Sequence, residues 1–189
     1  MKTLLVNNFS PFITDIANIF NELENKFDCY DCNQIHSIDA HLEFLRNFDH
    51  VVLSGRQKNS NIINKINSRI VKACLILDKP LLGICYGGQI LALTLGCTLK
   101  KIQKVKNIIN IDLVEPTTIL EGYKSVRMYE SHNFCISTLS NDFRLLGTSN
   151  SCTNELFCFK NKPLFGTQFH PEKSGKHGKD LLHNFLKMK

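Results

Sequence analysis

The sequence has no tryptophan, only five prolines and ten glycines, and no long apolar run. A chain so poor in glycine and proline is neither collagen-like nor a low-complexity segment. Its apolar runs are only a few residues long, against the roughly 20 residues that a membrane-spanning helix needs. The first residues also lack the apolar stretch of a signal peptide. The sequence therefore predicts a cytoplasmic protein that does not bind membranes.

The composition that is present is that of a globular protein. Of its 189 residues, 43% are hydrophobic and 21% are charged. This length allows one core of ordinary size, so we expect a single domain over residues 1–189. The eight cysteines are scattered through apolar segments, which indicates buried reduced thiols rather than a disulfide framework.

The formal net charge of +6 comes entirely from the second half of the chain. The first 98 residues carry nine basic and nine acidic side chains, and the remainder carry fourteen and eight. Four lysines fall within residues 100–106. Such a patch can meet a nucleic acid, a phosphorylated substrate or an acidic protein, but a solvated strand edge is the plainer interpretation. We expect no nucleic-acid partner.

Strands and helices alternate in the first half of the sequence. Apolar runs at residues 3–6, 27–30, 50–55 and 81–84 predict strands, and helical periodicity at 13–27, 62–77 and 87–95 predicts helices. This alternation favours an α/β fold, with a mainly parallel sheet covered by helices on both faces.

The second half has closely spaced strand-like runs, which we expect to add antiparallel strands. They lie at residues 108–114, 134–138, 145–149, 155–159 and 164–169. An amphipathic helix over 178–187 closes the chain.

One cysteine lies between a predicted strand and a predicted helix, at the carboxyl end of the sheet, where α/β proteins carry reactive side chains. Residues 83–87 read Gly-Ile-Cys-Tyr-Gly between an apolar strand and a helix, which is the form of a nucleophile elbow with cysteine in place of serine. The flanking glycines suit a tight, strained turn. At a helix N-terminus, Cys85 is favoured as the thiolate. The alternative is a buried structural cysteine beside a glycine turn.

A thiol that attacks an amide needs a base, and the base needs a group that orients it. His170 and Glu172 follow the apolar run at 164–169, and Pro171 between them enforces an extended turn. We expect both side chains to point to the same side. The sequence thus predicts a site formed by Cys85, His170 and Glu172.

In their order along the chain, these motifs resemble those of the class I, or triad, glutamine amidotransferases, which have a flavodoxin-like fold. The resemblance covers nearly the whole chain. Besides the elbow it includes residues 53–55 (Leu-Ser-Gly), 131–134 (Ser-His-Asn-Phe) and 168–172 (Gln-Phe-His-Pro-Glu).

The resemblance implies hydrolysis of the glutamine side-chain amide through a thioester on Cys85. His170 is then the general base and acid, and Glu172 orients it. The backbone N–H of Tyr86 serves as one oxyanion donor. Glutamine is bound by five residues: Gly55, Gln89, Ser131, Asn133 and Phe134. Residues 131–134 are expected to act as a loop through their backbone, with the His132 imidazole left to packing.

Arg56 departs from the family pattern, which has glycine there to supply the second oxyanion N–H. Arg56 still has an N–H, but its Cβ makes a positive φ costly. Three alternatives follow. Arg56 adopts a strained positive φ, or a partner remodels the loop that contains Arg56, or the chain is a weak glutaminase. A regulatory homologue without the chemistry is a further alternative.

No nucleotide-binding loop is recognisable, so a separate synthetase subunit must use the ammonia. We expect no cofactor and no metal, and a heteromer with an ATP-dependent or chorismate-type synthetase. The elbow and residues 130–133 resemble the amidotransferase subunit of GMP synthetase. The alternatives are the small subunits of anthranilate or aminodeoxychorismate synthase and of imidazole glycerol phosphate synthase.

Cys29 and Cys32 lie close to His36 and His41 in the sequence, which raises the question of zinc. The three residues between Cys32 and His36 are too few for the usual finger, and no second Cys-x-x-C is present. We expect ordinary thiols at both positions.

Overall fold

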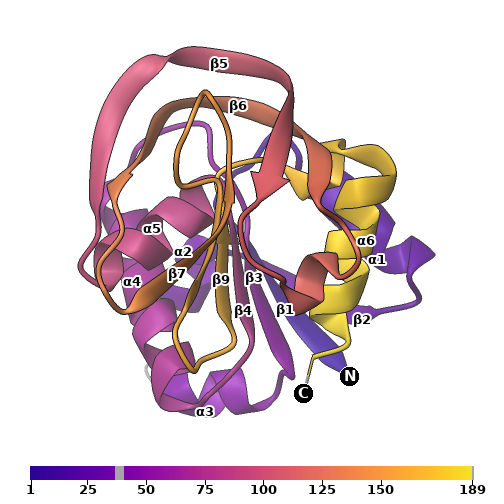
Figure 1. Ribbon diagram of the computed structural model, residues 1–189. Coiled ribbons are helices and arrows are strands. Elements are labelled where there is room, and N and C mark those ends of the chain that lie inside the picture. The colour runs from indigo at the N-terminus through magenta and orange to yellow at the C-terminus, as the bar shows by residue number, and fades with distance from the viewer. Residues whose placement is uncertain (37–40, 189) are drawn as a thin grey trace.

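A nine-stranded sheet runs through the residues that the computed structural model describes, 1–36 and 41–188 (Figure 1). The order across the sheet is β2-β1-β3-β4-β9-β8-β7-β5-β6. The strands are β1 (Lys2–Asn7), β2 (Lys26–Asp31), β3 (His50–Leu53), β4 (Leu81–Ile84), β5 (Thr98–Leu113), β6 (Ser125–Thr138), β7 (Phe143–Thr148), β8 (Leu156–Phe159) and β9 (Leu164–Thr167).

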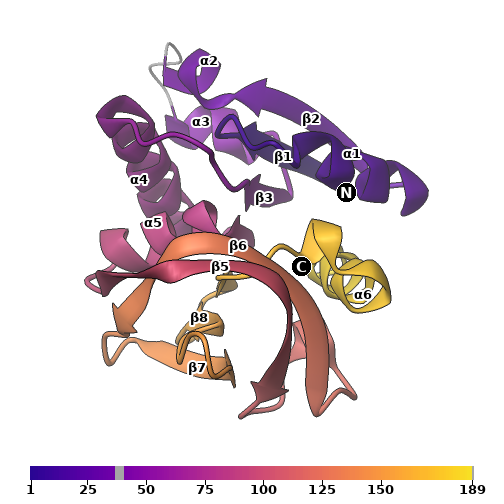
Figure 2. The ribbon, with the colours of Figure 1, turned by 90° about the horizontal axis from the view of Figure 1, so that it is seen from above.

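The helices lie on both faces of the parallel half of the sheet (Figures 1 and 2). They are α1 (Ile13–Glu22), α2 (Cys32–His36), α3 (His41–Arg46), α4 (Asn61–Ile76), α5 (Tyr86–Thr94) and α6 (Gly175–Leu186), with short 3-10 turns η1 (Thr118–Leu120) and η2 (Pro171–Lys173). No described helix is long and apolar enough to cross a membrane.

The short apolar runs form parallel strands because both of their faces are buried. Leu4 and Val6 of β1 face a core that α4 and α5 complete, whereas Leu5 faces a second core with α1 and α6. Residues of the neighbouring strands β3 and β4 divide between the two cores in the same way. The predicted α/β class is confirmed.

The antiparallel half of the sheet differs from the sequence-based expectation in two respects. The run that starts at Leu164 pairs with β4 in parallel, so β9 completes the parallel half, contrary to the prediction. The strands β5 and β6 are also much longer than predicted and pair over most of their length as a curved ribbon (Figure 2). Residues 131–134 therefore lie in strand β6, and the expectation of a loop was wrong.

Helices α2 and α3 were not predicted. Cys29 is exposed on β2, while Cys32 is buried at the start of α2. The side chains of His36 and His41 lie outside the part of the chain that the structure describes, as do residues 37–40. The described residues contain no cluster that could hold a metal ion.

Glycines allow the start of α5 to pack directly on the strand ends. A Cβ at Gly87 would overlap the backbone carbonyl of Leu53 on β3, and one at Gly88 would lie 2.6 Å from the Thr167 carbonyl oxygen. A Cβ at Gly83 would overlap the Gly87 carbonyl. Side chains at these positions would push the helix away from the sheet, so the glycines fix where α5 begins.

We expect Gly87→Ala to lower the free energy of unfolding by about 3 kcal/mol, because the backbone of β3 cannot move aside for the new methyl group. Gly122→Ala is the matched control. Its Cβ meets open space, and only the positive φ of 83° is unfavourable, at a cost of about 1 kcal/mol. Urea denaturation of both variants measures the difference, and equal losses would contradict the packing argument.

Candidate active site

Cys85 occupies the turn between β4 and α5, as the sequence predicts. It is the N-cap residue of α5 and has φ 50° and ψ −103°. Its N–H donates to the Thr167 carbonyl of β9 at 2.8 Å, and its carbonyl accepts from the Gln89 N–H at 2.9 Å. A non-glycine residue in this region of φ is strained. The two bonds hold the strained conformation and place the thiol at the carboxyl end of the parallel strands.

His170 and Glu172 are brought together as predicted. His170 Nδ1 lies 2.7 Å from Glu172 Oε1, and both residues are buried. The His170 N–H donates to the Tyr129 carbonyl of β6 at 2.8 Å. The Phe12 ring packs edge-on against the imidazole with centroids 5.0 Å apart. Backbone, carboxylate and ring contacts therefore fix the orientation of the imidazole.

Cys85 and His170 interact electrostatically across the carboxyl end of the sheet. Burial alone would lower the pKa of His170, but the negative charges of the Cys85 thiolate and of Glu172, with their hydrogen bonds, raise it well above its ordinary value. The charged form of the imidazole is thereby favoured beside Cys85 and Glu172. This arrangement can move a proton between the sulfur and a bound molecule.

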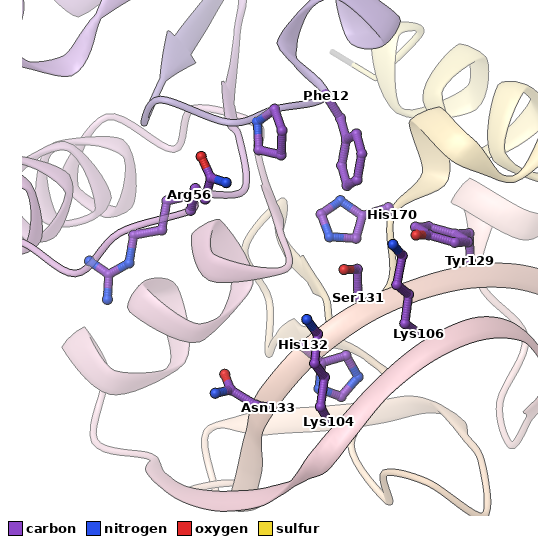
Figure 3. Close-up of a pocket in the computed structure, with 11 residues that line it drawn as sticks. Phe12, Arg56, Lys104, Lys106, Tyr129, Ser131, His132, Asn133 and His170 are labelled. Carbon is purple, nitrogen blue, oxygen red and sulfur yellow. The ribbon is translucent and has the colours of Figure 1, made fainter.

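Two adjoining cavities open beside these residues. One, of about 270 Å³, is lined by Cys85, Tyr86, Gln89 and Phe134 among others. The other, of about 470 Å³, includes His170 in its lining (Figure 3). Both are lined by Arg56, Gln57, Ser131, His132 and Asn133. The structure thus brings nearly all the predicted site residues to one cleft.

Gly55 and Glu172 line neither cavity, and Glu172 reaches the site through its bond to His170. Gly55 lies over the imidazole of His170, where a Cβ on Gly55 would be 3.0 Å from His170 Cε1. The predicted substrate-binding residue therefore contacts the histidine side of the site.

Gln89 is held by two carbonyl oxygens. Its Nε2 donates to the Phe134 carbonyl at 2.9 Å and to Gln168 Oε1 at 3.1 Å. Both amide hydrogens are then used, which leaves Gln89 Oε1 free to accept a hydrogen bond from a ligand. The Gln168 amide in turn approaches Cys85 Sγ at 3.8 Å. Sequence reasoning missed Gln168 as a site residue, although it stands in the same motif as His170.

Arg56 does not adopt a strained backbone, which was one of the three alternatives that the sequence left open. Among the described non-glycine residues with positive φ, Arg56 is absent and Cys85 is present. The Arg56 guanidinium stacks on the Tyr86 ring at 3.7 Å, and its Nη1 donates to Asn64 Oδ1 at 2.5 Å. Tyr86 Oη donates to the same oxygen at 3.0 Å. In Figure 3 the Arg56 side chain points away from His170.

The fold and the site define an α/β protein in which a cysteine elbow faces a histidine–glutamate pair. A model of the family described as Glutamine amidotransferase class-I matches residues 4–188. The chain therefore belongs to the class I glutamine amidotransferase family.

Two curated relatives are each named as a subunit of glutamine-hydrolyzing GMP synthase. The protein from Sulfolobus acidocaldarius is 33% identical over 158 residues, covering 79% of this chain and 81% of the relative. The one from Thermoplasma volcanium is 34% identical over 148 residues, covering 75% and 72%.

Solved structures show the same fold. The crystal structure of a protein from Thermoplasma acidophilum, described as a GMP synthase subunit, has a TM-score of 0.86 at 26% identity, covering 98% of this chain and 92% of that one. A glutamine amidotransferase from Thermotoga maritima has a TM-score of 0.81 at 19% identity, covering 99% and 96%.

Glu172→Gln should lower the pKa of His170, because it removes one of the negative charges that favour the imidazolium. Since the folded pKa lies above the unfolded one, the His170 contacts stabilise the folded chain fully below pH about 6.5, and this contribution is lost as the pH rises through the folded value. The difference in unfolding free energy between wild type and variant should therefore shrink at alkaline pH.

The pKa is measured by NMR titration of the His170 ring, and the stability by urea denaturation at each pH. Glu115→Gln is the matched control, since Glu115 pairs with Arg144 at the surface. An unchanged His170 titration in Glu172→Gln would contradict the assignment.

Proposed function

We propose that the chain is the glutaminase subunit of a two-subunit amidotransferase, with Cys85 as nucleophile, His170 as general base and acid, and Glu172 as its orienting group. The observation that carries the proposal is the strained Cys85 turn at the carboxyl end of the parallel strands, together with a buried imidazole that Glu172 orients and that interacts electrostatically with Cys85. A buried structural cysteine needs neither the strain nor a histidine that a glutamate orients.

The reaction follows from this geometry. The Cys85 thiolate adds to the side-chain amide carbon of glutamine, forming a C–S bond and a tetrahedral oxyanion. The C–N bond of this intermediate then breaks as His170 donates its proton to the departing nitrogen. Water then attacks the thioester while His170 takes its proton. Glutamate leaves, the thiolate is regenerated, and one ammonia is released for each glutamine.

The tetrahedral intermediate needs N–H donors for its oxyanion. The backbone N–H of Tyr86 suits this role because it lies in the first turn of α5, where N–H groups have no partner within the helix. The second donor is the N–H of Arg56. The Arg56 backbone does not have a positive φ, and its side chain is stacked on Tyr86 and bonded to Asn64.

Glutamine itself fits the smaller cavity, where Gln89 Oε1 is available for its α-ammonium group. The backbone of Ser131, Asn133 and Phe134 borders the same space. Gly55 closes the site from the side of the imidazole.

The acceptor proposed for the ammonia is the precursor of GMP, on a separate synthetase subunit. Support comes from the relatives named as GMP synthase subunits, which match this chain over most of both lengths. The chain itself shows no motif for activating the acceptor. A GMP synthase partner with its substrates should therefore stimulate ammonia release, whereas the chorismate-type synthetases should not.

Cys85→Ala should reduce ammonia release from glutamine at least about a thousandfold, because no other group can form the thioester. The assay is run on the chain with its partner synthetase. Cys97→Ala, which removes a buried thiol outside the cleft, is the matched control and should keep the activity. Ammonia release that survives Cys85→Ala would refute the proposal.

Arg56→Gly should raise the glutaminase rate of the isolated chain about tenfold, because glycine lets the peptide after Gly55 turn its N–H toward the oxyanion. Arg56→Ala also removes the guanidinium but keeps a Cβ, so it should give little gain. Initial rates of the two variants separate the backbone effect from the loss of stacking. Equal rates in Arg56→Gly and Arg56→Ala would show that the stacked side chain, and not the backbone, limits the activity of the isolated chain.

A further inference from the structure

Two glutamates that the proposed reaction does not use are buried together at the strand that borders both cavities. Glu130 is on β6 and Glu155 immediately precedes β8, and each is 0% exposed. A buried carboxylate is costly unless hydrogen bonds or charges compensate it. The contacts of Glu130 and Glu155 must therefore compensate the cost of burying both carboxyl groups.

The two carboxyl groups meet at the Ser151 hydroxyl, which lies 3.1 Å from Glu130 Oε2 and 3.3 Å from Glu155 Oε1. Burial, followed by the hydrogen bond and charge of Glu130, raises the pKa of Glu155 to about 9. Burial alone would raise the pKa of Glu130 as well, but hydrogen bonds from His132, Glu155 and Ser151 lower it. Glu155 is therefore the protonated member at neutral pH, and Glu130 carries the charge.

The charged Glu130 holds the His132 ring. Its Oε2 lies 3.1 Å from His132 Nε2, and His132 Nδ1 lies 3.0 Å from the Phe134 carbonyl oxygen. A carbonyl oxygen and an ionised carboxylate can only accept, so both ring nitrogens must carry a hydrogen for the two bonds to form. The imidazole is thereby fixed at both ends.

The Phe134 carbonyl links His132 to the substrate pocket. It accepts from both His132 and Gln89 Nε2, at 3.0 and 2.9 Å. Because both hydrogens of the Gln89 amide are committed to carbonyl oxygens, the position of the Phe134 carbonyl determines which way Gln89 Oε1 faces. A shift of this carbonyl would turn the acceptor away from the ammonium group of glutamine.

We infer that His132 is a positioning residue for glutamine, which the Glu130–Glu155 pair orients and which acts through the Phe134 carbonyl on Gln89. The inference rests on the proposed function and replaces the expectation that His132 only packs. It assigns the buried acid pair to substrate affinity and not to the thiol chemistry.

The first test measures how Cys85 is alkylated by the diazoketone analogue of glutamine, in the isolated chain. His132→Ala should raise the half-saturating concentration of the analogue about tenfold, as expected for a lost hydrogen bond to a charged network, with the maximal rate within about threefold. His132→Asn keeps a donor near the Nδ1 position and should recover most of the affinity. Alkylation by iodoacetamide, which has no amino group to bind, should stay at the wild-type rate in both variants.

An unchanged half-saturating concentration in His132→Ala would overturn the inference while leaving the proposed function intact. Failure of the analogue to alkylate wild-type Cys85 at all would overturn both. A slower reaction of His132→Ala with iodoacetamide would show a general effect on the site, which also contradicts a role in affinity alone.

The second test separates the two glutamates. Glu155→Gln is a neutral isostere of protonated Glu155 and should leave the half-saturating concentration within about twofold at pH 7, whereas Glu130→Gln should raise it about as much as His132→Ala does. Thermal melting of both variants checks that they fold. Equal effects of the two substitutions would contradict the assignment of the proton.

The pH dependence gives an independent measurement. Glu155 faces Glu130, the Cys152 thiol and the hydroxyls of Ser149 and Ser151. Above pH 9 its ionisation places a second negative charge beside Glu130, so the wild type should lose affinity relative to Glu155→Gln. The amino group of the analogue also loses its proton at high pH, equally for both proteins. The measured quantity is therefore the ratio of the half-saturating concentrations of the wild type and Glu155→Gln. A ratio that does not change with pH would overturn the role of the pair.

Discussion

The site depends on one packing constraint, the direct contact between the first turn of α5 and the ends of the parallel strands. Glycines at 83, 87 and 88 allow this contact because a Cβ at any of them would meet backbone atoms. The contact leaves the chain too little room to turn with ordinary dihedral angles, and Cys85 takes the resulting positive φ. The same turn that strains the backbone aims the thiol at His170.

The two halves of the sheet supply different parts of the site. The parallel half carries Cys85 after β4 and leads through β9 to His170 and Glu172. The antiparallel half contributes β6, whose residues border both cavities and whose Tyr129 carbonyl anchors the His170 backbone. The proposed chemistry thus lies on strands buried on both faces, and the proposed recognition of substrate on the long curved ribbon.

The elbow and the His-Pro-Glu segment could be predicted from sequence because each is local, with its conformation determined by neighbours in the chain. The lengths of β5 and β6 could not be predicted. Both strands carry exposed polar residues on the ribbon, so they lack the continuous apolar pattern that marks a buried strand. Arg56 shows a similar limit, since its stacking on Tyr86 depends on Asn64 of another helix.

The sequence by itself determined the α/β class, the turn at Cys85 and the pairing of His170 with Glu172, since these follow from apolar runs, glycines and a proline close together in the chain. Only the tertiary structure decided that Glu155 meets Glu130, that Gln168 reaches Cys85 and that Gly55 lies over His170. Those contacts join residues far apart in sequence. The distances between these residues, and the protonation of the two glutamates, depend on burial and strand register. No local pattern in the sequence encodes either.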